Sequence, residues 1–226
     1  MTSTSVEESL DRAQAAVTAG DGLSGTGFWS AVATVKRNPE LAERFADRIA
    51  EIDETAFRQW VLLTVPLGLG TALAVAASLI GIFLVGLAYA LDGFLAILVF
   101  YAGLVALLAS THGLGHLVVG WAVGIRFTCW FVGRVTQPQP GVKVDYASYL
   151  RTNPRGRAWM HASGAIVTKA VPFLLIGAAI AADLASWAVW LLPVIGVGSI
   201  VTDVLWSTSK SDWKKFKREM SFAQAS

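Results

Sequence analysis

The chain has 226 residues, of which 54% are hydrophobic and only 15% are charged. Soluble domains carry about 25% charged residues, so the composition excludes an ordinary soluble domain and indicates an integral membrane protein. The formal net charge of +2 gives no reason to expect a nucleic-acid partner. The single cysteine, Cys129, excludes an intramolecular disulfide and a cysteine-rich metal site.

Residues 1–58 are polar and precede the first apolar run. The first 27 are rich in Ser, Thr and Gly, which predicts a poorly ordered stretch, and their acidic character argues against a cleavable signal peptide. Asn38-Pro39-Glu40 is typical of a helix N-terminus. An amphipathic helix is expected over 39–58, lying on the membrane or against the protein, because four apolar residues share one stripe: Leu41, Phe45, Ile49 and Ile52.

Residues 59–207 form the predicted membrane core. Each of its apolar segments exceeds the ~20 residues that cross the hydrocarbon core of a bilayer. The four segments cover about 61–91, 93–125, 158–182 and 184–206. The sequence therefore predicts an all-α polytopic membrane protein with four transmembrane helices.

The basic residues, apart from Lys169, lie on one side of this core. Six precede residue 60, six lie between Arg126 and Arg157, and five follow Ser209, whereas the turns at Asp92 and Asp183 carry none. The positive-inside rule makes the basic side cytoplasmic, so both termini of a multi-pass cell-membrane protein are expected there. The basic tail over 208–226 is expected to attract anionic membrane lipids.

Two histidines four residues apart, His112 and His116, lie inside the second segment. On a helix this spacing puts both rings on one face, which suits two ligands of one metal ion. His161 in the third segment and Asp203 in the fourth are expected at a similar depth, in the cytoplasmic third of the bilayer. Ionisable residues inside a membrane are costly and usually functional, so a metal site is expected here. Interhelical hydrogen bonding without a metal is one alternative, and a haem held by His116 and His161 is another.

The motif Thr111-His-Gly-Leu-Gly-His-Leu117, followed by Gly124-Ile-Arg126, resembles the site-2 proteases, the M50 class of intramembrane zinc metalloproteases. That resemblance implies zinc held by His112, His116 and an aspartate of a later span, here Asp203. It also implies proteolysis of a transmembrane or extended peptide near the cytoplasmic face.

The sequence departs from this family at Gly113, which stands where the H-E-x-x-H motif has its general base. Glycine cannot take a proton from water, and acid–base assistance is typically worth about 10²–10⁴-fold in rate. The favoured interpretation is a pseudoprotease that binds membrane peptides without efficient turnover. Two alternatives stay open: an active zinc protease with an unconventional base, for which His161 is the candidate, and a small metal or proton transporter or sensor. His161 has two other roles open to it, as a third metal ligand or as a hydrogen-bond partner of a ligand.

Two further features of the core have alternative interpretations. Alternating apolar residues on both sides of Gln137-Pro-Gln-Pro-Gly141 predict a small β-hairpin between the second and third spans. In the family such a sheet captures substrate as an added strand, although an ordinary loop hairpin has the same pattern. Lys169, in the middle of the third span, is expected either to pair with an intramembrane carboxylate or to snorkel to the membrane surface.

Overall fold

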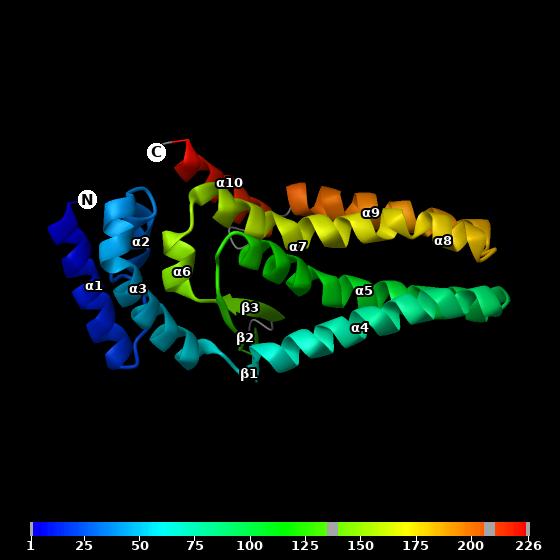
Figure 1. Ribbon diagram of the computed structural model, residues 1–226, viewed down its shortest axis with the longest axis horizontal. Coiled ribbons are helices and arrows are strands. Elements are labelled where there is room, and N and C mark those ends of the chain that lie inside the picture. Colours follow the sequence, from blue (N-terminus) through cyan, green and yellow to red (C-terminus); the bar gives the residue numbers. More distant parts are fainter. Residues whose placement is uncertain (1, 135–139, 206–210, 225–226) are drawn as a thin grey trace. The chain divides into compact units, whose positions relative to one another are not determined.

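The computed structural model describes residues 2–134, 140–205 and 211–224, and the chain divides into two compact units. Unit 1 consists of Met1–Leu67, Gly120–Ala158 and Arg218–Ser226, and unit 2 consists of Gly68–Val119 and Trp159–Lys217. The ribbon in Figure 1 labels the elements of both units. The strands are β1 (Leu63–Pro66), β2 (Phe127–Val132) and β3 (Pro140–Val144). The helices are α1 (Ser3–Thr18), α2 (Phe28–Val35), α3 (Pro39–Trp60), α4 (Leu67–Leu87), the short η1 (Ala88–Ala90), α5 (Gly93–Ala122), α6 (Tyr146–Arg151), α7 (Pro154–Leu174), α8 (Ile176–Ala181), α9 (Ser186–Leu205) and α10 (Asp212–Ala223).

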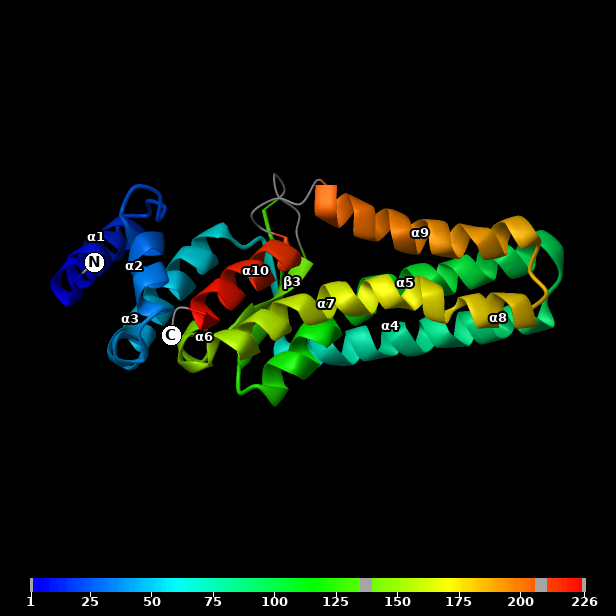
Figure 2. The same ribbon diagram turned by 90° about the horizontal axis from the view of Figure 1, so that it is seen from above.

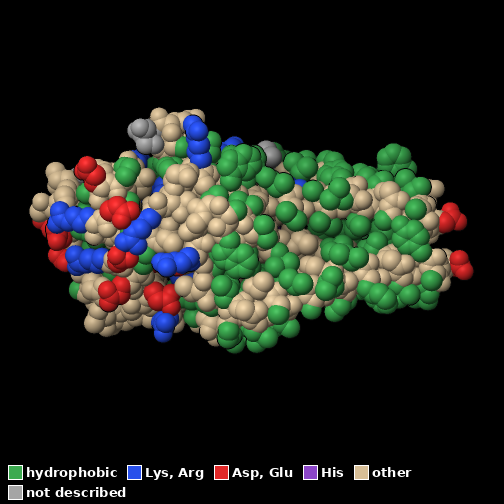
Figure 3. Space-filling view, in the orientation of Figure 1, with side chains coloured by type: hydrophobic (Ala, Val, Ile, Leu, Met, Phe, Trp, Pro, Cys, Tyr) green, Lys and Arg blue, Asp and Glu red, His purple; other side chains and the backbone are tan. Residues whose placement is uncertain are grey.

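The described residues contain four helical segments that are long and apolar enough to cross a membrane. These segments are Leu67–Ala90, Gly93–Ala122, Pro154–Ala181 and Ser186–Asp203. The predicted all-α polytopic fold with a small hairpin is therefore confirmed. Large hydrophobic side chains cover much of the surface of unit 2, as expected for helices that face lipid (Figure 3).

Unit 2 is held together by close helix contacts and a few interhelical hydrogen bonds. Figures 1 and 2 show α4 and α5 side by side, and they approach closely where Gly81 meets Gly103. The Tyr101 hydroxyl of α5 donates to the Ala188 carbonyl of α9 at 2.6 Å. Ser78 and Ser110 join α4 to α5 through their hydroxyls at 2.8 Å. Small and polar residues of this kind stabilise helix pairs that have no hydrophobic driving force in lipid.

The sheet of unit 1 has three antiparallel strands in the order β1-β2-β3 within the described residues. Phe131 of β2 lies opposite Thr64 of β1 and Gly141 of β3. The predicted hairpin is thus present with an additional strand, and most of its expected turn, residues 137–139, lies outside the described residues. The expectation that the first span begins at residue 61 was wrong: Leu63–Pro66 is a strand, and the helix begins at Leu67. Pro66 is compatible with this position because β1 lies at the edge of the sheet.

The N-terminal segment is helical, which corrects the expectation of a poorly ordered stretch over 1–27. α1 covers residues 3–18 and contacts α2 and α3. An apolar stripe on α1 explains the order, because it removes hydrophobic surface from water: Val6, Leu10, Ala13 and Val17 are buried. α3 begins at Pro39 with the Asn38 side chain capping its first turn, and it continues two residues past the expected end at 58.

A buried charge cluster ties three segments of unit 1 together. Glu219 of α10 is fully buried and accepts from Lys36 at 2.6 Å and from Arg157 at 2.7 Å. The Tyr149 hydroxyl donates to the same carboxylate at 2.9 Å. The Arg157 guanidinium also donates to the backbone carbonyl oxygens of Lys36, Leu150 and Thr152. A buried charge is tolerated when it is paired and hydrogen-bonded in this way.

Candidate metal centre

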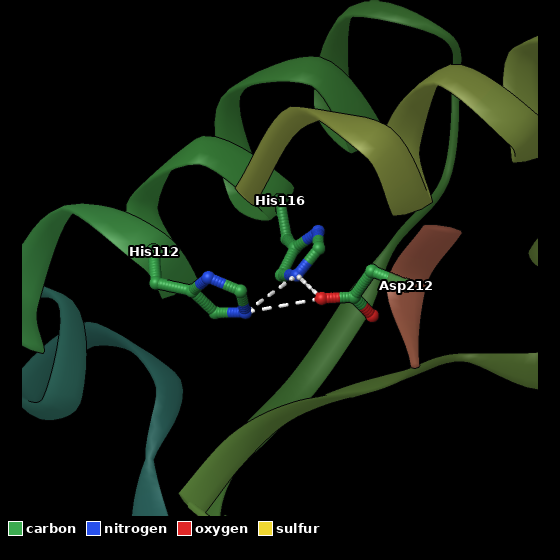
Figure 4. Close-up of side chains that lie close together, drawn as sticks. All are labelled: His112, His116 and Asp212. Atoms are coloured by element: carbon green, nitrogen blue, oxygen red, sulfur yellow. Dashed lines mark hydrogen bonds and ion pairs between the residues drawn. The ribbon is translucent and has the colours of Figure 1, made fainter. Parts of the chain in front are cut away.

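The two histidines of the motif lie one turn apart on α5 and point the same way (Figure 4). The ring centroids of His112 and His116 are 4.8 Å apart, and the ring planes are nearly perpendicular. Their Nε2 atoms lie 3.2 Å from each other. The i,i+4 spacing therefore does what a helix dictates: it places two imidazole nitrogens beside one point in space.

A carboxylate of α10 completes the group. Asp212 Oδ2 lies 3.1 Å from His112 Nε2 and 3.3 Å from His116 Nε2 (Figure 4). The three atoms thus form a nearly equilateral triangle. In tetrahedral zinc sites, with ligand bonds of about 2.0–2.1 Å, neighbouring ligand atoms are about 3.3 Å apart. The triangle therefore has the dimensions of one face of a zinc tetrahedron.

Hydrogen bonds alone do not satisfy such a triangle. Each hydrogen bond needs one donor and one acceptor, and donors and acceptors cannot alternate around three mutually contacting atoms. While the carboxylate is ionised, at least one edge joins two acceptors or two donors, whichever ring nitrogens carry protons. A cation placed against all three atoms removes this conflict, because two imidazole nitrogens and a carboxylate oxygen then all act as ligands.

The other ring nitrogen of His116 is fixed by the backbone of α7. Nδ1 lies 2.7 Å from the carbonyl oxygen of Met160. A carbonyl oxygen only accepts, so Nδ1 carries a proton, and Nε2 is the ring nitrogen that faces the other two ligand atoms. Metal-binding histidines in proteins usually make this kind of hydrogen bond, which orients the ring and selects its tautomer.

Asp212 is held in its ionised form by its neighbours. Burial raises its pKa, but hydrogen bonds with His112 and His116 outweigh burial and bring the pKa well below the ordinary value. Its other oxygen, Oδ1, accepts from Lys215 at 3.2 Å. The anionic form is the one that binds metal ions.

Aromatic contacts hold the start of α10 against α7. The Phe216 ring lies 5.5 Å from Trp159 of α7 and 5.2 Å from Trp213, measured between ring centroids. Trp213 follows Asp212 directly in the chain. These contacts limit the positions that the Asp212 carboxylate can take.

α5 and α7 approach each other closely beside the histidines. A Cβ at Gly115 would lie 3.2 Å from the Cα of Gly164. The Ser163 hydroxyl also lies 3.0 Å from the carbonyl oxygen of Gly115 and donates across the two helices. Glycine at both positions therefore lets α7 support the His116 ring directly.

The structure places Asp203 elsewhere, which corrects the expected ligand set. Asp203 Oδ2 forms an ion pair with Lys169 Nζ at 2.5 Å, and it is not in the group of possible metal ligands found among the described residues. That group consists of His112, His116 and Asp212. Lys169 thus follows the first of its two alternatives, pairing with a carboxylate.

The two remaining candidates, Gly113 and His161, are not in the ligand group. Gly113 is buried on α5 and has no side chain to offer. His161 is half-buried on α7, and the group of possible ligands in the described residues does not include it.

Sequence reasoning missed Asp212 because it lies in a basic stretch beyond the last span. The five cations of residues 210–218 predicted a lipid-binding stretch, and the single carboxylate among them, Asp212, was not considered as a metal ligand. Its position in the first turn of a helix was the available signal, since acidic residues favour that position. No protein-family model, curated protein or solved structure matches this chain.

Proposed function

We propose that this chain is an integral membrane protein that binds zinc through His112, His116 and Asp212. The observation that carries the proposal is the triangle of ligand atoms, whose edges of 3.1, 3.2 and 3.3 Å match a zinc tetrahedron. Two histidines and one carboxylate are also the ligand set of known zinc peptidases. Zinc with these three ligands would accept a water molecule or a substrate oxygen as its fourth ligand.

The site is that of a site-2-protease-like pseudoprotease. Zinc held by His112, His116 and Asp212 would supply an electrophile that polarises a peptide carbonyl. Hydrolysis also needs a base beside the metal, and the motif has Gly113 in that place. Asp212 does not replace the base, since its oxygen contacts both imidazole nitrogens, as a ligand would. The consequence is peptide binding with little or no cleavage.

An extended segment of a membrane protein is the ligand class that fits this assignment. The three-stranded sheet of unit 1 supports it, because β1 pairs with β2 alone in the described residues and leaves one edge for another strand. The distribution of basic residues supports a cytoplasmic location for both termini in the cell membrane. The basic stretch over 210–218 is suited to anionic lipid headgroups.

Metal analysis of the protein purified in detergent tests the zinc site. We expect about one zinc per chain and its loss in the double variant His112→Ala/His116→Ala. Metal-free wild-type protein that also fails to take up added zinc would overturn the proposal. A cobalt-substituted sample gives an independent signal, because tetrahedral cobalt has a strong visible spectrum.

A cleavage assay on a transmembrane peptide library tests the assignment as a pseudoprotease. Wild type is expected to be inactive or nearly so. Gly113→Glu restores the missing carboxylate and should raise hydrolysis, whereas Gly113→Gln has the same shape without a base. Strong wild-type cleavage that neither substitution increases would show that another residue serves as the base.

A further inference from the structure

A small cavity of unit 2, here called the Lys169 pocket, lies outside the metal-binding group. Its volume is about 130 Å³. It is lined by Ala165, Ile166, Lys169, Ile200, Asp203 and Trp213.

Two residues that line the pocket are chain neighbours of residues at the metal centre. Trp213 lines the pocket, and Asp212, the residue before it, contributes the carboxylate of the ligand triangle. Ala165 lines the pocket, and Gly164, the residue before it, contacts the His116 ring. The wall of the pocket therefore includes the residue that follows the ligand Asp212 on α10 and the residue that follows Gly164, the neighbour of the His116 ring, on α7.

The size of the pocket suits a single side chain. An apolar protein cavity of about 150 Å³ holds one benzene molecule. A volume of about 130 Å³ is slightly smaller and admits a branched aliphatic group. Much of the wall is formed by apolar side chains, those of Ala165, Ile166, Ile200 and Trp213.

The two charged residues of the wall neutralise each other. Lys169 and Asp203 pair at 2.5 Å, so an apolar occupant meets a closed ion pair and leaves neither charge without a partner. A charged side chain of either sign would have to break this ion pair, and it would leave either Lys169 or Asp203 without its partner. The lining thus favours an uncharged, branched group.

We infer that the Lys169 pocket is the specificity subsite of the metal centre and takes one branched aliphatic side chain of the bound peptide. This inference rests on the proposed zinc site, because the metal is what would hold the peptide carbonyl beside the pocket. It adds a preference that the metal ligands alone do not supply. A residue of leucine type next to the metal-bound carbonyl is the expected ligand.

A comparison of two hydroxamates of different chain size distinguishes binding in the pocket from binding to the metal. Acetohydroxamate has a zinc-binding group and a single methyl group, whereas isocaprohydroxamate has the same zinc-binding group and a branched aliphatic chain. Binding to the zinc-loaded protein in detergent is measured by calorimetric titration. We expect isocaprohydroxamate to bind at least about tenfold more tightly, because the pocket removes several methyl and methylene groups from water.

The matched variant Ala165→Leu fills the pocket at a residue that is not a metal ligand. It is expected to abolish the tenfold preference and to leave acetohydroxamate binding unchanged. It also controls for partition of the longer chain into detergent, which is the same for both proteins. Because Ala165 is buried and the larger side chain can disturb folding, a second variant is needed.

Ile200→Ala enlarges the pocket at a residue that is 41% exposed, so folding is little affected. It should shift the preference toward hydrocinnamohydroxamate, which carries a phenyl ring. Equal binding of acetohydroxamate and isocaprohydroxamate to wild type would overturn the subsite while leaving the zinc site intact. Failure of acetohydroxamate to bind at all would overturn the zinc site, and the subsite with it.

Discussion

Gly164 of α7 lies directly against the ring of His116. A Cβ at Gly164 would lie 2.5 Å from His116 Nε2 and 2.8 Å from the carbonyl oxygen of His112. Cβ atoms in proteins essentially never approach other atoms to less than 3.0 Å. The position of a metal-binding nitrogen on α5 therefore depends on the absence of a side chain on α7.

Gly164→Ala is expected to weaken zinc binding by about 10–100-fold, the range seen when groups that orient metal ligands are changed. The ring could swing away, but the backbone carbonyl of His112 also has to move, so α5 and α7 must separate. Chelator competition measures the affinity. Gly177→Ala is the matched control, because a Cβ there has no neighbour within 4 Å. Equal zinc affinity in both variants would contradict this account of the helix contact.

Asp212 and Asp203 give opposite predictions for the same substitution. Asp212→Asn keeps the shape of the side chain but removes the anionic ligand, so zinc affinity should fall by at least about 100-fold, more than an orienting group contributes. Asp203→Asn should leave zinc affinity unchanged and lower thermal stability, because Lys169 loses its partner. Zinc content of the two variants, measured side by side, checks the assignment. Loss of zinc in Asp203→Asn alone would return Asp203 to the ligand set.

The histidine pair was predictable from sequence and the third ligand was not, for a physical reason. The distance between His112 and His116 is set within one helix, by a period that the sequence displays directly. Asp212 belongs to α10, and its distance from α5 depends on tertiary packing around Phe216 and Trp159. Asp203 was predicted instead because its position along the fourth span puts it at the depth of the histidines. That depth does not show which way its side chain points.

The other errors have a similar origin. Hydropathy did not separate the strand Leu63–Pro66 from the span that follows, because a short apolar run fits either structure. The serine, threonine and glycine content near the N-terminus predicted disorder, although α1 carries an apolar stripe whose buried residues include Val6 and Leu10. The four spans themselves were predictable, since membrane-crossing helices need long apolar runs and little else.

Glu219→Gln is expected to lower the free energy of unfolding by about 3–5 kcal/mol, the cost of removing one partner from a buried ion pair. The amide cannot neutralise Lys36 and Arg157, and both side chains are almost fully buried beside it. Denaturant unfolding in detergent measures the change. Glu8→Gln is the control, because Glu8 is exposed on α1, and its effect should be within about 0.5 kcal/mol. A similarly small effect of Glu219→Gln would show that the cluster contributes little to folding.

The same carboxylate predicts how stability depends on pH. Burial raises the pKa of Glu219, but the charges of Lys36 and Arg157 outweigh burial, so the pKa in the folded protein lies below its ordinary value. The unfolded chain, with a glutamate pKa of about 4.3, then binds more protons than the folded chain in the window between the two values. Stability therefore increases with pH through that window. The contribution of Glu219 is fully present above about pH 4.3 and is lost as the pH falls toward the folded pKa.

The difference in unfolding free energy between wild type and Glu219→Gln isolates this contribution, because every other carboxylate is common to both proteins. That difference should shrink as the pH falls below about 4.3. Glu8→Gln should follow the wild-type curve at every pH. A difference that stays constant down to about pH 3 would mean that Glu219 remains ionised throughout that range. The loss of stability in acid would then have to come from other carboxylates. Asp47 is one example, because its hydrogen bond with Arg151 also lowers the pKa of Asp47.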